Sequence, residues 1–454
     1  MAFEGLEQEN LRGFQNRLTL LSAAGMFLDG FDLTVIAVAL PLLVKQFHIG
    51  AGLTGLVGSS AVIGMLVGSL VLGHLTDRIG RRAMYLVDLL FFVVFAGLTA
   101  LSQNVMELLI FRFLLGLGIG ADYPISSTLV AEFSPSRRRG GLVTVLGAMW
   151  FVGAVAAYVV GLLLLGLGPE AWRYMMLVGA ALALVVIGFR SAIPESPRWL
   201  NARGRQAEAQ AVLKKLTGVT SDMGPARPRR RWSELFSRPF IRRTVFVAGF
   251  WFCYDVAFYG ISIYSPTVLK TFTAGSQALA DVGAAVVSLL GVLGALIGLS
   301  LVDRWGRRPL MLLAFGGLSA ALIVLGISPT PALGLLVLLF GLSELFANMG
   351  PGVLDFVYPT ELFPTGIRAS ATGFATAVSR VGAILGILVF PSLVKSWGLG
   401  RALWLFAVAS LLGFGISLWL APETRGRLLE SLSDGSESHG EGPRPAIPGA
   451  GPLQ

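Results

Sequence analysis

The chain has 454 residues, of which 54% are hydrophobic and only 13% are charged. Soluble globular domains carry about 25% charged residues, so this composition excludes an ordinary soluble protein. The formal net charge is +9, and the distribution of the basic residues favours a membrane-topology signal over nucleic-acid binding. The single cysteine, Cys253, excludes an intramolecular disulfide and a cysteine-cluster metal site, and His48, His74 and His439 have no metal-ligand spacing.

Apolar windows of 18 or more residues recur along nearly the whole chain, which is the signature of membrane-spanning helices. The first of them continues from a mixed-charge terminus into a full-length span, so no cleavable signal peptide is expected. We predict an all-α membrane protein with twelve transmembrane helices in two pseudo-symmetric six-helix bundles. The predicted spans are 18–45, 54–75, 83–101, 107–130, 142–165, 172–193, 244–271, 281–302, 310–328, 332–359, 370–394 and 401–421.

One long connection divides the spans six and six. The expected regions are an N-terminal segment (1–17), a first bundle (18–193), a basic central loop (194–243), a second bundle (244–421) and a tail (422–454). The tail is rich in Ser, Gly, Glu and Pro beyond about Gly426, which is typical of disorder. The segment PARPRRRW of the central loop is interpreted as a topology signal against anionic headgroups rather than as a partner site.

Most Lys and Arg residues lie in the termini, the central loop and the connections on the same side. The loops of the opposite side hold only Lys45, Lys270, Lys395 and Arg401. The positive-inside rule then predicts that both termini are cytoplasmic, in a multi-pass protein of the plasma membrane.

Three motifs occur twice, in the same order and at nearly equal separations. DRIGRR at 77–82 returns as DRWGRR at 303–308, and PES at 194–196 returns as PET at 422–424. The pattern E-x-x-P-x-x-x-R begins at Glu132 and again at Glu361. These repeats indicate an internal duplication. Two six-helix halves with a substrate site between them are the architecture of several secondary transporters.

These motifs resemble the major facilitator superfamily, specifically its sugar-porter and phosphate-porter branch, over about residues 18–426. The resemblance is carried by G-x-x-x-D-R-x-G-R-R from Gly73 to Arg82, PESPRWL at 194–200, DRWGRR and PETRG at 422–426. It implies alternating access by rocking of two bundles, commonly coupled to protons. A membrane enzyme is disfavoured and no cofactor is expected, because the sequence contains no visible nucleophile–base pair or metal cluster.

The repeated motifs place acids and bases where the two bundles meet on the cytoplasmic side. Such charges can pair across the halves when an inner gate is shut and separate when it opens. The alternative is that they anchor helices and set topology, but topology needs only the bases. The predicted gate residues are Asp77, Arg81, Arg82, Glu132, Arg139, Asp303, Arg307, Arg308, Glu361 and Arg368.

Ionisable residues inside the spans are candidates for function, because a charge facing lipid is costly. They are Asp29, Asp32, Asp88, Arg112 and Asp122 in the first half, and Asp255, Glu344, Asp355 and Arg380 in the second. Asp29 and Asp32 are three residues apart and share one face of the first span.

Sugar porters carry an aspartate after Gly-aromatic on span 1 and an arginine that opens span 4. By this resemblance Asp32 is the proton-binding group and Arg112 is its partner. A nearby cation favours the ionised carboxylate and desolvation favours the protonated one, so a changing distance between them would switch the proton. The alternative is a static buried ion pair. Asp29 either joins this site or helps to hydrate it.

Asp122-Tyr123-Pro124 resembles the phosphate-porter signature that contributes to the substrate site of that branch. Trp251, Asp255 and Tyr259 share one face of span 7, with helix packing as the alternative explanation. The predicted substrate site comprises Asp122, Tyr123, Trp150, Trp251, Asp255, Tyr259, Glu344, Asn348 and Arg380.

Three positions depart from the phosphate-porter pattern. Trp150 stands where that branch carries a glutamine, Gly352 where it carries an asparagine, and Arg380 where it carries a lysine. Span 7 also lacks the glutamine-rich segment of sugar porters. The mixture of aromatic rings, carboxylates and an arginine suits the stacking of a sugar or the binding of an organic anion.

The sequence therefore predicts a proton-coupled symporter that imports a sugar or another small polar or anionic metabolite. One alternative is an inorganic phosphate–proton symporter, and another is a nutrient sensor that no longer transports. The expected partners are the substrate, protons and the lipid bilayer, without nucleic acid. A monomer is expected to suffice.

Overall fold

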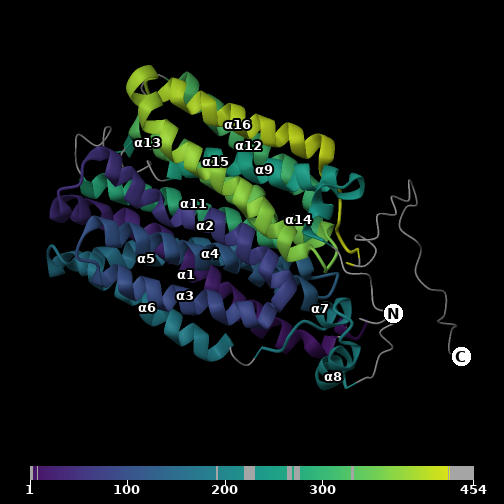
Figure 1. Cartoon of the computed structure of the whole chain (residues 1–454). Helices are drawn as coiled ribbons and strands as arrows, with labels where there is room; N and C mark the ends of the chain where they lie inside the picture. The colour runs from purple at the N-terminus through teal and green to yellow at the C-terminus, as the bar shows by residue number, and fades with distance from the viewer. Residues whose placement is uncertain are drawn as a thin grey trace, which may run out of the picture.

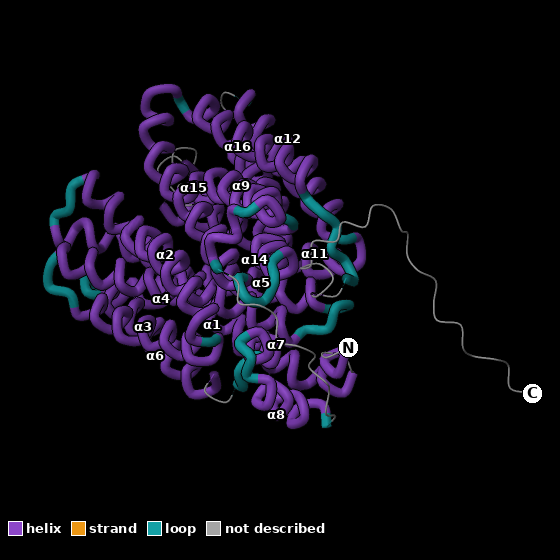
Figure 2. Tube along the Cα trace, turned by 45° about the vertical axis from the view of Figure 1, so that its right-hand side comes forward, coloured by secondary structure: helices purple, strands orange, loops and turns teal. Residues whose placement is uncertain are grey.

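We describe a computed structural model of the chain. It describes residues 4–7, 9–190, 193–218, 231–262, 268–269, 277–328, 332–427 and 429. These residues are helices joined by short loops (Figure 2). The basic stretch of the central loop before Arg231, and the tail predicted to be disordered, lie outside the described residues.

The first half of the chain forms six long helices that overlap the six predicted spans. They are α1 (Arg12–Phe47), α2 (Ala51–Ile79), α3 (Arg81–Leu101), α4 (Val105–Phe133), α5 (Arg139–Leu164) and α6 (Ala171–Arg190). Helix α1 begins six residues before its predicted span, and the buried Gln15 anchors this polar extension. The Gln15 amide donates hydrogen bonds to the carbonyl oxygens of Leu6 (2.9 Å) and Phe133 (3.2 Å).

Short helices follow at one end of the bundle: α7 (Pro197–Ala202), α8 (Gln206–Thr217) and η4 (Trp232–Phe236). The N-terminal turns η1 (Glu4–Glu7) and η2 (Glu9–Leu11) lie at the same end, against α8. We call this end of the molecule the α7 end; it is at the right of Figure 1. Turn η3 (Leu165–Leu167) follows α5.

The second half repeats the arrangement. Its helices are α9 (Arg238–Ser262), α11 (Gln277–Trp305), α12 (Arg307–Ile327), α13 (Leu333–Met349), α14 (Pro351–Leu362), α15 (Arg368–Trp397) and α16 (Leu399–Leu420). The span predicted over 332–359 is divided between α13 and α14. Gly350 leaves the helical conformation (φ −123°, ψ −82°), and Pro351 starts the new helix because its missing N–H is not needed there.

Eleven segments of the described chain are helical, long and apolar enough to cross a membrane. The outside of the bundle is apolar, as a lipid-facing surface must be. Leu163 and Trp419, for example, are 75% and 80% exposed. Helix α4 is the opposite extreme, because every residue from Gly118 to Phe133 is buried. A helix so enclosed can carry charges that lipid would not tolerate.

The two halves meet along two equivalent pairs of helices. Helix α2 packs on α15, and α5 packs on α11. These are the second and fifth spans of opposite halves, so the duplication read from the sequence relates the two interfaces. Glycine allows the close approach at the first of them, since a Cβ at Gly373 would collide with the backbone of Ser69. Figure 1 shows the halves as two stacked bundles, purple to blue and green to yellow.

Candidate functional site

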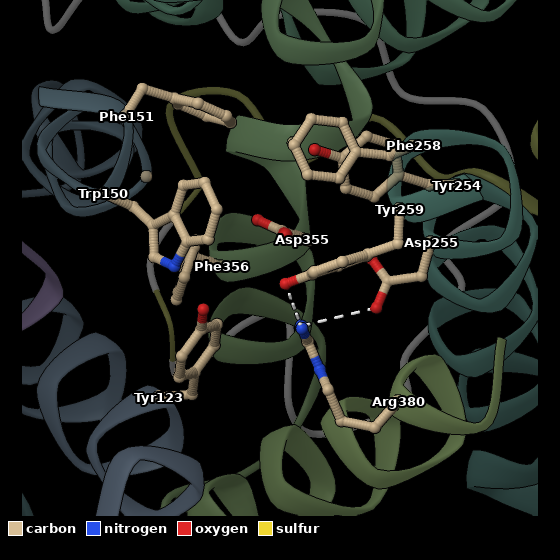
Figure 3. Close-up of a pocket in the computed structure, with 12 residues that line it drawn as sticks. Tyr123, Trp150, Phe151, Tyr254, Asp255, Phe258, Tyr259, Asp355, Phe356 and Arg380 are labelled. Atoms are coloured by element: carbon tan, nitrogen blue, oxygen red, sulfur yellow. Dashed lines mark hydrogen bonds and ion pairs between the residues drawn. The ribbon is translucent and has the colours of Figure 1, made fainter. Parts of the chain in front are cut away.

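A small cavity lies between the two halves. Helices α4 and α5 supply one wall, and α9, α14 and α15 supply the other (Figure 3). The lining residues are Tyr123, Gly147, Trp150, Phe151, Tyr254, Asp255, Phe258, Tyr259, Gly352, Asp355, Phe356 and Arg380. Rings dominate the lining, and the charged groups all come from the second half.

Arg380 is the cation of this cavity. Its Nη1 donates a 2.6 Å hydrogen bond to the hydroxyl of Tyr259, and its Nη2 lies 3.4 Å from Oδ2 of Asp255. Figure 3 marks both contacts with dashed lines. The guanidinium carbon also lies 5.3 Å from the ring centroid of Tyr123, which is within cation–π range. Arg380 therefore joins both walls and neutralises one carboxylate.

Several polar atoms of the lining have no hydrogen-bond partner among the residues that the structure describes. Oδ1 of Asp355 and Nε1 of Trp150 are buried and make no hydrogen bond to any described residue. Buried polar groups are normally satisfied, so such atoms are available to a bound molecule. A small molecule with hydroxyl groups could hydrogen-bond to both atoms while its apolar faces stack on the rings.

Three of the predicted substrate residues lie behind the lining. The Trp251 ring packs against Tyr123, with 6.4 Å between centroids, and does not line the cavity. Asn348 accepts a 3.0 Å hydrogen bond from the Tyr254 hydroxyl and donates one of 3.1 Å to Glu344. Glu344 and Asn348 are therefore linked to the cavity lining through Tyr254. Periodicity places them on a helix face but does not say what that face meets.

The predicted pair in the first half is present. Nη2 of Arg112 on α4 lies 3.2 Å from Oδ2 of Asp32 on α1, and both side chains are buried. Neither residue lines the cavity. The pair is thus enclosed within the first half, where its charges attract each other strongly because water does not screen them.

Asp122 does not line the cavity, contrary to the expectation for a substrate residue. It turns away from the cavity to Arg190 at the end of α6, with 3.2 Å between Oδ1 and Nη1. Nη1 of Arg190 also lies 3.1 Å from Oδ2 of Asp88. Sequence reasoning missed Arg190 because it stands near the end of a predicted span, where a base is ordinary. The sequence did contain a signal for a further base. The predicted spans of the first half hold four aspartates, but Arg112 is the one base that we named with them.

At the α7 end, each half contains the same local ion pairs. Arg81 lies 3.0 Å from Asp77 and 3.1 Å from Glu132. In the second half, Arg307 lies 2.9 Å from Asp303 and 3.0 Å from Glu361.

Other contacts at this end cross between the halves. Arg368 lies 2.9 Å from Glu132, and Arg139 lies 3.0 Å from Glu361. In addition, Asp77 accepts two 2.7 Å hydrogen bonds from Ser370, and Asp303 accepts one of 2.7 Å from the backbone of Gly141. Cross-half contacts of this kind hold the two bundles together at the α7 end.

Arg82 and Arg308 have a different setting from the other predicted gate residues. Their backbone N–H groups donate to Glu195 (3.2 Å) and Glu423 (3.1 Å), the acids of PES and PET. The Arg308 side chain donates to the Leu418 carbonyl of its own half (2.9 Å). The two acids lie at the N-termini of α3 and α12, where helix dipoles favour negative charge. The sequence showed their repetition but not this role.

Glycine is required immediately before each of these helices. Gly80 and Gly306 have φ of +126° and +100°, a region that other residues rarely adopt. A Cβ at Gly306 would also lie 2.5 Å from a carboxylate oxygen of Glu423. The glycine of each D-R-x-G-R-R motif therefore lets the chain turn sharply over the acid.

Comparison with known proteins is consistent with this geometry. The family model described as "Sugar (and other) transporter" matches residues 18–434. The chain is 36% identical over 419 residues to YaaU of Escherichia coli (strain K12), covering 92% of this chain and 94% of YaaU. It is 34% identical to the inner membrane metabolite transport protein YgcS of the same organism, covering 91% and 93%.

More distant relatives differ in what their names say they carry. An arabinose-proton symporter of Bacillus subtilis (strain 168) is 29% identical, covering 92% of this chain and 94% of that protein. A protein of Arabidopsis thaliana named as a probable inorganic phosphate transporter is 28% identical, covering 92% and 93%.

The fold is similar to that of the proton:xylose symporter XylE, solved with 6-bromo-6-deoxy-D-glucose bound. The TM-score is 0.80 at 24% sequence identity, covering 92% of this chain and 98% of XylE. The predicted fold of two six-helix bundles is thereby confirmed. The chain belongs to the sugar (and other) transporter family of the major facilitator superfamily, and it is a multi-pass membrane transporter rather than an enzyme.

Proposed function

We propose that the protein is a proton-coupled symporter for a sugar or a related small polar or anionic metabolite. The observation that carries the coupling is the buried Asp32–Arg112 pair, 3.2 Å apart and enclosed in the first half. Protonation of Asp32 would remove the attraction to Arg112, so proton binding would change the packing of α1 on α4. The family resemblance, which assigns Asp32 and Arg112 these same roles, supports the proposal.

The substrate would bind in the central cavity. Its rings, especially Tyr123 and Trp150, can stack on the flat face of a sugar or an organic acid. Asp355 and Trp150 offer an unpaired acceptor and an unpaired donor. Arg380 can contact a substrate oxygen, although it already compensates Asp255. This donor and acceptor set favours a polyhydroxylated substrate.

Alternating access would use the α7 end as one gate. In the described conformation Arg368–Glu132 and Arg139–Glu361 join the halves there, so this end is closed. Rocking of the bundles about the cavity would separate these pairs. The cavity, with Tyr123 and Arg380, would then open toward the α7 end. We propose that this end faces the cytoplasm, which the distribution of basic residues supports, and that the protein acts as a monomer in the plasma membrane.

Transport by purified protein in liposomes tests the proposal. Under an inward proton gradient, we expect uphill accumulation of at least one compound from a panel of labelled sugars, organic acids and phosphate. Asp32→Asn should abolish uphill accumulation but leave substrate exchange at least partly intact. Glu208→Gln removes an exposed carboxylate from α8 and serves as the matched control, with accumulation expected to equal the wild type. Unchanged accumulation by Asp32→Asn would refute the proton role.

Phosphate–proton symport is the second candidate, and similarity to the Arabidopsis thaliana protein favours it. The cavity speaks against it, because Asp255 and Asp355 would repel a phosphate that Arg380 alone attracts. The panel separates the two, since phosphate accumulation without sugar accumulation would reverse the order. A sensor that does not transport would bind a compound in the panel without accumulating any.

A further inference from the structure

The first half buries a second group of charges that the proposed transport cycle does not use. We call it the Arg190 cluster: Asp29 on α1, Asp88 on α3, Asp122 on α4 and Arg190 on α6. None of the four side chains lines the cavity, and each residue is at most 3% exposed.

The charges of this cluster do not balance. Arg190 bonds to Asp88 at 3.1 Å and to Asp122 at 3.2 and 3.3 Å, so one guanidinium serves two carboxyl groups before Asp29 is considered. With all three acids ionised, two negative charges would be uncompensated inside the bundle. A single charge at the bilayer centre costs about 2.5–3.5 kcal/mol on insertion scales. A carboxyl group avoids this cost by holding a proton.

Asp29 has the fewest partners of the three acids. Its Oδ2 is buried and has no hydrogen-bond partner within the described part of the chain. Asp88 is held by the backbone N–H of Leu89 (2.7 Å), and Asp122 by the hydroxyl of Ser126 (2.7 Å), in addition to Arg190. Since hydrogen bonds to the ionised form stabilise it, Asp29 is the acid of the cluster that gains most from a proton.

The backbone of α1 confirms the direction in which Asp29 points. Gly25 lies one helical turn earlier on the same face. A Cβ at Gly25 would collide with Nη2 of Arg190 and with Oδ2 of Asp122. This face of α1 is therefore pressed against the cluster, and Asp29 interacts electrostatically with Asp122, Asp88 and Arg190.

Tyr123 connects the cluster to the cavity. It follows Asp122 in the chain, and its ring lines the cavity at 5.3 Å from the guanidinium carbon of Arg380. Electrostatic interactions couple the Tyr123 hydroxyl to both Arg380 and Asp29. A substrate that moves Tyr123 or draws Arg380 toward itself would change the field at Asp29.

We propose that the Arg190 cluster is a second proton-binding site, distinct from the Asp32–Arg112 pair, and that Asp29 carries its exchangeable proton. The charged groups that face Asp29 are Asp32 on its own helix, Asp88 on α3, Asp122 on α4 and Arg190 on α6. Proton binding by the cluster stands by itself. Its contribution to transport, a second proton in each cycle, rests on the proposed function.

Infrared difference spectroscopy of the purified wild type tests proton binding without transport. Stepping the pH should produce carbonyl bands of two protonated carboxylic acids, one from Asp32 and one from Asp29, and both should shift in D2O. The Asp29 band should be absent in Asp29→Asn, which mimics the protonated side chain, and retained in Asp32→Asn, the matched change one turn away, which should instead lose the Asp32 band. Asp29→Glu, which keeps a carboxyl group, should shift the Asp29 band and substitutes for Asp29→Asn if that variant does not fold.

Three spectroscopic outcomes would overturn the proposal. If Asp29→Asn lost none of the wild-type bands, the exchangeable proton of the cluster would lie on a group other than Asp29. A carboxylic acid band that pH does not change would make the cluster a permanently protonated structural element. A band that responds to sodium at constant pH would make it a cation site instead.

Accumulation of a neutral substrate against pH gradients measures the number of protons. With two protons the accumulation ratio rises about hundredfold per pH unit, and with one it rises about tenfold. The wild type should follow the first slope and Asp29→Asn the second. A tenfold slope in the wild type would refute the second coupled proton. Absence of any uphill accumulation would instead refute the proposed function, while the spectroscopic result would remain valid.

Discussion

At the α7 end, the two halves of the molecule repeat the same contacts at nearly the same distances. Glu132 and Glu361 each accept one arginine from their own half and one from the other, at 2.9 to 3.1 Å. In the middle of the bundle the halves have diverged. The first half encloses Asp32–Arg112 and the Arg190 cluster, whereas the second half turns Asp255, Asp355 and Arg380 into the cavity.

This difference separates two requirements of the fold. A gate that both halves close needs equivalent partners on each side, so the duplicated contacts persist. The interior is under no such constraint, since an acid buried within one half and an acid facing a cavity do different chemistry. Under the proposed function, the first half binds protons and the second half supplies the charged groups that contact substrate, with Tyr123 between them.

The largest effect is expected from removing Arg190, the cation of the Arg190 cluster in the first half. Arg190→Met would leave three carboxyl groups without compensation, and removing one partner of a buried ion pair costs about 3–5 kcal/mol. Thermal unfolding in detergent should show a large loss of stability. Arg205→Met, at an exposed pair on α8, is the control and should leave the melting temperature unchanged. Equal melting temperatures for the two variants would show that Arg190 does not stabilise the first half.

A smaller effect is expected from weakening the gate, and it should be the same whether the changed glutamate belongs to the first or the second half. Glu132→Gln and Glu361→Gln each weaken one cross-half and one local charged hydrogen bond, worth about 1.5–3 kcal/mol each. Opening at the α7 end should therefore increase about tenfold or more in both variants. The readout is thiol labelling of Ala369→Cys, a buried position on the α15 face that meets α2, in a Cys253→Ser background.

Similar labelling rates in the two gate variants would support a gate shared by both halves. An increase in only one of them would mean that the duplicated contacts no longer work as equivalents. The parent with Ala369→Cys and both glutamates intact provides the baseline.

The smallest effect is expected at the wall where the first half meets the substrate. Trp150→Phe keeps an aromatic ring, though a smaller one, and removes the unpaired Nε1 donor. Loss of one neutral hydrogen bond corresponds to roughly 0.5–1.5 kcal/mol, so the KM for transport should rise about 2- to 10-fold. Trp419→Phe, on the exposed outer surface, should leave it unchanged. An unaltered KM in Trp150→Phe would show that this indole donor does not contact substrate.

Much of this molecule could be predicted from local pattern alone. Twelve apolar segments, the repeated D-R-x-G-R-R and E-x-x-P-x-x-x-R motifs and the long central loop specify helices, their number and their duplication. The pairing of Asp32 with Arg112 was also predictable, because the family resemblance names both positions. The sequence predicts helix ends less well. At α1, for example, the helix extends beyond its apolar run, where the buried Gln15 anchors it.

The tertiary structure decided which charge meets which. Asp122 and Tyr123 are adjacent in sequence, yet one turns to Arg190 and the other lines the cavity. Glu344 and Asn348 share a helix face, yet neither lines the cavity, and Asn348 instead bonds to Tyr254, which does. Helical periodicity determines which residues share a face, and it contains no information about the neighbour of that face. In a bundle whose helices are apolar on most sides, only tertiary packing determines which neighbour each helix face meets.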